Sequence, residues 1–184
     1  MDLDAQQALQ GRLGASEQLL WSGRPRQGLL LRRADVFNIP FSILWCGFAV
    51  FWTISAHGNG APLAFLFPGF LFVAIGLYFV FGRFFYDAQV RARTYYGLSS
   101  ERILILGGML NRELKSLNVR TLSDVSLVER SDGRGTITFG PTGPWDSWGS
   151  GSSWPGMGSN SPRFDCIDNA KQVYDLVRDA QKRA

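Results

Sequence analysis

Between Asp35 and Arg83 the chain has no aspartate, glutamate, lysine or arginine, over the 47 residues 36–82. Such a stretch is foreign to the surface of a soluble domain, where charged side chains are spread throughout. It divides into two apolar arms, residues 36–56 and 61–82, on either side of a short polar turn that holds the only histidine. Each arm is long enough to cross about 30 Å of hydrocarbon as a helix. We therefore predict a two-helix transmembrane hairpin.

Two further features are missing from the arms. Neither arm contains the pattern Gly-x-x-x-Gly, so a tight glycine-mediated crossing of the two helices is not expected. Neither arm contains a charged side chain, which counts against a pump, a channel or an ion-coupled transporter. A cleaved signal peptide is a poor alternative for the first arm, because the arm begins late, is too long and is followed directly by a second one. The hairpin is interpreted as an anchor.

Cysteine and histidine are scarce, with two and one respectively. Cys46 lies within the first arm and Cys166 near the C-terminus, so no disulfide framework is expected and a reducing cytoplasm suits the chain. One histidine and two separated cysteines cannot build a zinc site. Ser99 and Ser100 have no partnering histidine that could act as a base for nucleophilic catalysis. The glycines at 107–108 and 133–135 lack the spacing and the lysine of a phosphate-binding loop. We expect no catalytic residue, metal or cofactor, and a protein that is not an enzyme.

The basic residues are dispersed along the chain. The formal net charge is +4 and no run of five or more basic residues occurs, so a nucleic-acid partner is not expected. Arginines flank both arms while the connecting turn has none, which predicts that both termini face the cytoplasm. Arginine supplies 16 of the 19 basic residues, which favours a bacterial source and hence a multi-pass protein of the bacterial inner membrane. A hairpin that re-enters one leaflet is the alternative, and the length of the arms argues against it.

The 35 residues before the first arm are too few for a domain, so residues 1–35 are interpreted as a cytoplasmic N-terminal segment. Within it, a short helix over residues 2–13 is expected, with Asp2 or Asp4 as its cap. An extended segment over residues 17–25 follows, because Gly-Arg-Pro ends its brief apolar run.

After the hairpin, residues 83–184 are predicted to form one small cytoplasmic domain. Short runs of alternating or branched apolar residues predict antiparallel strands, and the final segment has the apolar spacing i, i+3, i+4, i+7 of an amphipathic helix capped by Asp168. Residues 140–162 are predicted to be a long loop, because 16 of these 23 residues are Gly, Pro or Ser. The expected strands are 95–98, 102–106, 112–117, 123–130, 136–139 and 163–167.

Three stretches carry a resemblance to a known family. They are residues 20–25 (Leu-Trp-Ser-Gly-Arg-Pro), residues 96–105 (Tyr-Gly-Leu-Ser-Ser-Glu-Arg-Ile-Leu-Ile) and residues 164–174. They resemble three segments of the bacterial PH-like (bPH) domain membrane proteins. The first resembles the segment before the transmembrane pair, and the second resembles the Tyr-x-Leu-Thr-x-x-Arg start of the barrel, with Ser99 in place of threonine. The third resembles the last strand and the C-terminal helix. The resemblance implies a transmembrane hairpin followed by a mainly-β PH-like barrel, with one C-terminal helix. It implies no agreed ligand and carries over no binding residue.

These observations predict a membrane-anchored binding or scaffolding module that holds an unknown protein partner, or a second copy of itself, at the bilayer. The alternative is that the barrel and its tryptophan-rich loop sense anionic lipid headgroups. Each basic group near an anionic leaflet contributes about 1 kcal/mol to membrane binding. The alternative for the arginines is that they only set the membrane topology. The alternative for the tryptophans is that their rings pack back over the barrel. The candidate lipid or interface contacts are Arg91, Arg93, Arg102, Trp145, Trp148 and Trp154.

Overall fold

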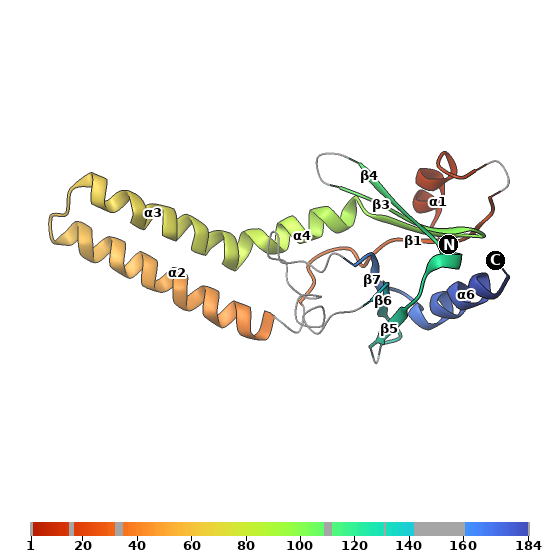
Figure 1. The fold of residues 1–184 in the computed structure, drawn as a ribbon. Helices are drawn as coiled ribbons and strands as arrows, with labels where there is room; N and C mark the ends of the chain where they lie inside the picture. Colours follow the sequence, from red (N-terminus) through yellow and green to blue (C-terminus); the bar gives the residue numbers. More distant parts are fainter. Residues whose placement is uncertain are drawn as a thin grey trace. The chain divides into compact units, whose positions relative to one another are not determined.

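The structure is a computed structural model, and it describes residues 2–14, 17–31, 35–108, 112–130, 132–141 and 161–183. These residues fall into two compact units. The hairpin unit comprises the described part of residues 29–87. The sheet unit comprises the described parts of residues 1–28, 88–146 and 159–184. Figure 1 labels the elements of both units, which are described separately below.

Both predicted arms of the hairpin unit are helical. The first is α2 (Asp35–Gly58), and the second begins as α3 (Leu63–Leu77). The second helix then passes through a π-helical turn, η1 (Tyr78–Gly82), into α4 (Arg83–Ala92), so that it runs on beyond the predicted arm. Gly82 ends this turn close to the Tyr78 ring, from which a Cβ at residue 82 would lie 2.7 Å.

The helices α2 and α3 pack closely through small residues. A Cβ on Gly76 would lie 3.0 Å from the Cα of Cys46, and a Cβ on Gly69 would lie 2.5 Å from Oγ1 of Thr53. The expectation that glycines do not mediate this crossing is therefore wrong. These glycines are seven residues apart rather than four, which is the spacing of a left-handed helix pair, so the absence of Gly-x-x-x-Gly was not informative.

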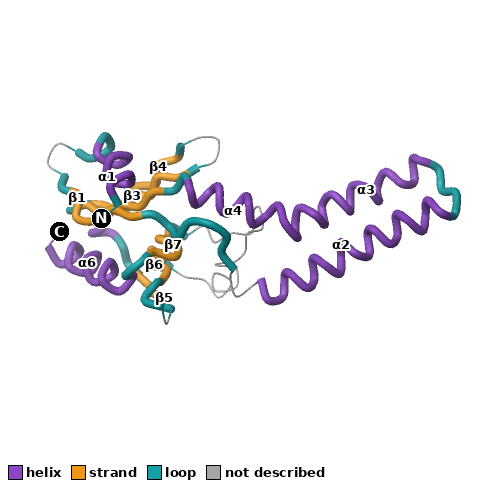
Figure 2. Tube along the Cα trace, turned by 180° about the vertical axis from the view of Figure 1, so that it is seen from behind, coloured by secondary structure: helices purple, strands orange, loops and turns teal. Residues whose placement is uncertain are grey.

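The sheet unit contains two antiparallel sheets and a C-terminal helix, α6 (Ala170–Arg183). The four-stranded sheet has the order β1-β2-β3-β4 and the three-stranded sheet has the order β5-β6-β7 (Figure 2). All six predicted strands are present, with ends that shift by up to two residues. The strands are β1 (Leu19–Gly23), β2 (Tyr95–Ser99), β3 (Arg102–Gly107), β4 (Glu113–Asn118), β5 (Val125–Glu129), β6 (Gly135–Phe139) and β7 (Arg163–Ile167), with a 3-10 turn η2 (Val119–Thr121) between β4 and β5.

The first strand of the sheet unit precedes the hairpin, whereas its neighbour follows the hairpin. Strand β1 pairs antiparallel with β2, with Ser22 opposite Gly97 and Gly23 opposite Tyr96. The apolar hairpin is thus an insertion between two adjacent strands of one sheet. The sheet unit therefore also takes in residues before the hairpin, which the predicted bounds 83–184 leave out.

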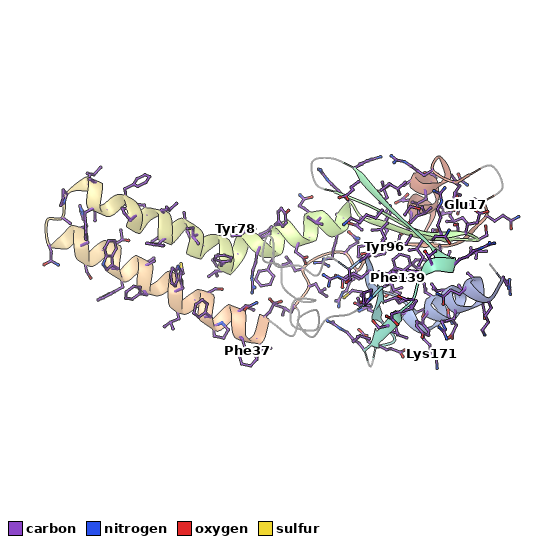
Figure 3. The ribbon with its side chains drawn as sticks, viewed as in Figure 1. Glu17, Phe37, Tyr78, Tyr96, Phe139 and Lys171 are labelled. Carbon is purple, nitrogen blue, oxygen red and sulfur yellow. The ribbon has the colours of Figure 1, made fainter. Side chains whose placement is uncertain are left out.

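The two sheets and α6 share one hydrophobic core. Phe164 of β7 is fully buried and its ring meets Trp21 of β1 at 5.4 Å, Tyr96 of β2 at 4.8 Å and Phe139 of β6 at 5.0 Å between centroids. Tyr96 and Phe139 lie inside the sheet unit (Figure 3). Because the ring of Phe164 contacts strands of both sheets, it ties them together. The buried residues of α6 that complete this core are Ala170, Val173, Val177 and Ala180.

The opposite face of the four-stranded sheet is covered by α1 (Leu3–Gln10). As predicted, Asp2 caps this helix, since its carboxylate accepts hydrogen bonds from the backbone N–H groups of Asp4 and Ala5. Leu9 packs against Leu104 and Leu106 of β3 in a second buried cluster. The sheet has space for this contact because residue 97 is glycine: a Cβ there would lie 2.7 Å from Leu9. The N-terminal segment is therefore part of the fold.

Among the described residues the two sheets do not join into a closed barrel. Strand β4 pairs only with β3, and β5 pairs only with β6. Both strands consequently present one unpaired edge. What is established is a two-helix apolar hairpin, two antiparallel sheets and one C-terminal helix.

Candidate functional site

The surface of the hairpin unit is apolar. Phe37 at the start of α2 is 80% exposed and points away from α3, and Leu63 is 84% exposed (Figure 3). In each of the two long helices only 17% of the most apolar window is buried. A helix in the core of a soluble protein would instead be mostly buried. The structure thus contains two helices that are long and apolar enough to cross a membrane.

The two charges that bound the apolar stretch meet each other. Nη2 of Arg83 lies 3.0 Å from Oδ1 of Asp35, and the side chains are only 2% and 5% exposed. The guanidinium also lies over the Phe84 ring, 4.6 Å from its centroid. A buried charge is tolerated only when it is paired. The ion pair therefore joins the start of α2 to the second helix at the point where its apolar part ends.

A shallow groove lies on the hairpin unit. It has a volume of about 170 Å³, and its lining is almost entirely apolar. A binding site for a specific small molecule normally adds a few polar groups that orient the ligand. This groove suits only apolar matter such as acyl chains. Its lining residues are Trp45, Phe48, Ala49, Trp52 and Phe72.

Arg91, a predicted headgroup contact, lies inside the sheet unit. It is 4% exposed, and its guanidinium donates hydrogen bonds to the backbone carbonyls of Arg26, at 2.5 Å, and Gly28, at 2.9 Å. The side chain of Gln27 in turn donates to the carbonyl of Arg91 at 3.3 Å. Arg91 thus links the segment after β1 to the helix before β2, and a lipid headgroup would have to displace these carbonyls to reach it.

Arg102, the second predicted contact, forms an ion pair within the sheet unit. Its Nη2 lies 2.7 Å from Oε2 of Glu17, and its Nε also donates to that carboxylate. Ser99 donates a hydrogen bond to the same carboxylate and accepts one at 3.0 Å from the N–H of Arg102. The Arg102 hydrogen bond is the main reason that the pKa of Glu17 falls from 4.5 to about 2. The serine and arginine of the family-like stretch therefore hold the N-terminal segment against the β2–β3 turn.

Glu17 was not among the residues singled out from the sequence. Its carboxylate also accepts a hydrogen bond from the N–H of Gly14 at 2.8 Å. Glu17 stands just before β1, far along the chain from Arg102, so no local pattern reveals the pair. Its position two residues before a short apolar run is the only signal that the sequence carried.

The remaining predicted lipid contacts are one exposed arginine and three tryptophans. Arg93 is exposed and follows α4 directly. Trp145, Trp148 and Trp154 lie outside the described residues. Arg91 and Arg102 are thus held by different partners within the sheet unit, and the predicted lipid contacts stay predictions.

Within the described ranges, no group of three or more His, Cys, Asp or Glu side chains is placed to hold a metal ion. No family model, curated protein or solved structure matches this chain. The candidate interaction surfaces among the described residues are therefore the apolar hairpin and the unpaired edges of the two sheets.

Proposed function

We propose that this chain is a membrane-anchored PH-like binding or scaffolding module. The hairpin unit crosses a bacterial inner membrane twice, with both termini in the cytoplasm. The sheet unit then holds a protein partner, or a second copy of the chain, next to the bilayer. The observation that carries the proposal is an outward-facing apolar hairpin inserted between two paired strands of one sheet.

The insertion supports an even number of membrane crossings. Because β1 and β2 are hydrogen-bonded neighbours, the chain before α2 and the chain after α4 must lie on the same side of any bilayer. The exposed apolar side chains favour lipid around both helices, since burying large apolar side chains contributes about 25 cal/mol per Å². The basic residues that flank the arms favour the cytoplasm for that side.

The strand arrangement supports the PH-like assignment. Sheets of four and three antiparallel strands pack around one core, and the amphipathic helix α6 completes it. The resemblance implies antiparallel strands and one C-terminal helix for this domain, and both are present, although the described strands form two sheets rather than a closed barrel. In this proposal the unpaired edges of β4 and β5 form the open corner of the PH-like barrel.

Lipid sensing is the weaker candidate. Arg91 and Arg102 are engaged by Arg26, Gly28 and Glu17 within the sheet unit. Arg93 is exposed and directly follows α4. A binding module that contacts protein is therefore better supported than one that reads anionic headgroups.

The anchor is tested on the full chain expressed in bacteria. We expect the protein to stay in the membrane pellet after an alkaline carbonate wash. Single cysteines at Asn59, in the turn, and at Arg183, near the C-terminus, should react with a membrane-impermeant maleimide from opposite sides. Native Cys46 and Cys166 are replaced by alanine in this background. Release by carbonate, or labelling of both positions from one side, would contradict the proposed anchor.

A further inference from the structure

Strand β5 has one edge that no described residue covers. The N–H of Arg130 donates to the carbonyl of Arg134, and the N–H of Gly140 donates to that of Asp124, so the even-numbered residues of this strand bond to β6. In an antiparallel pair the backbone groups alternate in direction. The N–H and C=O groups of Val125, Leu127 and Glu129 therefore point away from β6, to the open edge.

The side chains on the outer surface of this strand have a self-complementary order. Asp124 and Arg130 directly precede and follow β5, are both exposed, and have no ion-pair partner among the described residues. Between them, Val128 is 66% exposed beside the partly buried Ser126. A second β5, running antiparallel about a two-fold axis at Leu127, would place Asp124 opposite Arg130 of the other copy, twice.

We propose that this chain forms a homodimer in which two β5 strands pair antiparallel, with Leu127 of each copy at the two-fold axis. The backbone groups at the open edges would satisfy one another, since residues 125, 127 and 129 then oppose residues 129, 127 and 125. On the outer face of the strands, Asp124 of one copy would face Arg130 of the other, and Ser126 would face Val128. Directly opposed unlike charges stabilise such a pairing, and like charges destabilise it. The two three-stranded sheets become one continuous six-stranded sheet.

The inference rests on the proposed membrane anchor. A five-residue strand pairing is small compared with a stable interface between freely diffusing proteins. Confinement to one bilayer raises the effective concentration of the sheet units, which makes a weak contact sufficient. The contact is isologous, so it closes at two copies and does not propagate into a filament.

The open edge of β4 does not have this complementarity. The bond between the N–H of Val119 and the carbonyl of Glu101 places Leu114, Ser116 and Asn118 on its outer edge. A symmetric pairing about Ser116 would set Lys115 opposite an apolar residue, Leu117. In this central register, charge favours β5 over β4 as the self-associating edge.

The test uses the full chain, labelled with donor or acceptor dyes and reconstituted into neutral lipid vesicles at decreasing protein-to-lipid ratios. Energy transfer reports self-association. We expect Asp124→Arg and Arg130→Asp each to weaken association by about tenfold, equivalent to ~1.4 kcal/mol. The double variant D124R/R130D should restore it. Arg112→Asp and Glu113→Arg, which make the same charge changes beside β4, serve as matched controls and should leave association unchanged.

A proline variant tests the backbone part of the pairing. The N–H of Glu129 has no acceptor among the described residues, so Glu129→Pro removes an edge donor while the bonds to β6 remain. We expect this variant to keep its circular dichroism spectrum and lose energy transfer. The dimer is overturned if the unmodified chain stays monomeric, if the charge variants match their controls, or if the double variant is not restored. Failure of the anchor itself would appear instead as release by carbonate.

Discussion

Nη2 of Arg83 lies 3.0 Å from Oδ1 of Asp35, although the two residues stand at opposite ends of a stretch of 47 uncharged residues. Each is the charge nearest to the apolar hairpin on its side. The pair defines where the apolar part of each helix ends and sets the two helices in register.

Breaking this ion pair should destabilise the hairpin strongly. Asp35→Asn or Arg83→Met removes one member of this buried pair, which costs about 3–5 kcal/mol, whereas the double variant removes both charges and should recover much of the loss. Unfolding of the full chain in mild detergent by increasing SDS measures this. Equal losses in the double variant and the worse single variant would argue against a direct pair.

A methyl group at residue 76 should push the hairpin helices apart. The Cβ of Gly76→Ala would lie 2.9–3.0 Å from Cβ and Cα of Cys46, and a backbone atom cannot rotate away. Overpacking of this kind costs about 1–3 kcal/mol. Gly47→Ala is the matched control, because a Cβ there meets nothing within 4 Å. The same SDS titration should show a loss only for the residue 76 variant.

Acid should weaken the link between the N-terminal segment and the β2–β3 turn. The folded chain holds the pKa of Glu17 at about 2 rather than 4.5, so its stabilisation is complete above pH 4.5 and is lost as the pH falls from 4.5 towards 2. Arg102 is one third exposed, so solvent reduces the effect to about 1–2 kcal/mol.

Glu17→Gln should therefore lower the free energy of unfolding at pH 7 and flatten its dependence between pH 4.5 and 2. Urea titrations of the full chain in detergent at several pH values measure both effects. The exposed Glu113→Gln is the control and should change neither. An unchanged pH profile in the residue 17 variant would show that the ion pair contributes nothing.

A fragment that starts at Arg91 should not fold, although it contains every strand after the hairpin. It lacks β1, which pairs with β2, and it lacks Trp21, whose ring contacts Phe164. Adding a peptide of residues 2–28 should restore the sheet unit. Amide hydrogen exchange of β2 measures this, with protection expected only in the mixture. Full protection of β2 in the fragment alone would show that β1 is dispensable.

The elements of this fold were largely predictable from local sequence. The apolar arms, the short strands and the spacing of Ala170, Val173 and Val177 each have a period that identifies an element without reference to the rest of the chain. The helix cap at Asp2 is likewise a local feature. The cap of α6 at Asp168 stays a prediction, and the carboxylate of Asp168 accepts a hydrogen bond from Arg134 at 2.8 Å.

What the sequence did not reveal is which elements meet. The pairing of β1 with β2 and of Glu17 with Arg102 joins residues on opposite sides of the hairpin, and a period contains no information about partners. The close contact of Gly76 with Cys46 was missed for a related reason. A glycine's role depends on what faces it, and Gly47 in the same hairpin faces open space.

The place of the hairpin between two paired strands also has a consequence for biosynthesis. Strand β1 leaves the ribosome long before β2, so it waits unpaired until both hairpin helices have been made. With the hairpin spanning a membrane as proposed, failure of the second helix to insert would leave β2 on the far side, and the sheet could not close. Completion of the sheet thereby reports that insertion succeeded, and a misinserted chain exposes an incomplete sheet to cellular proteases.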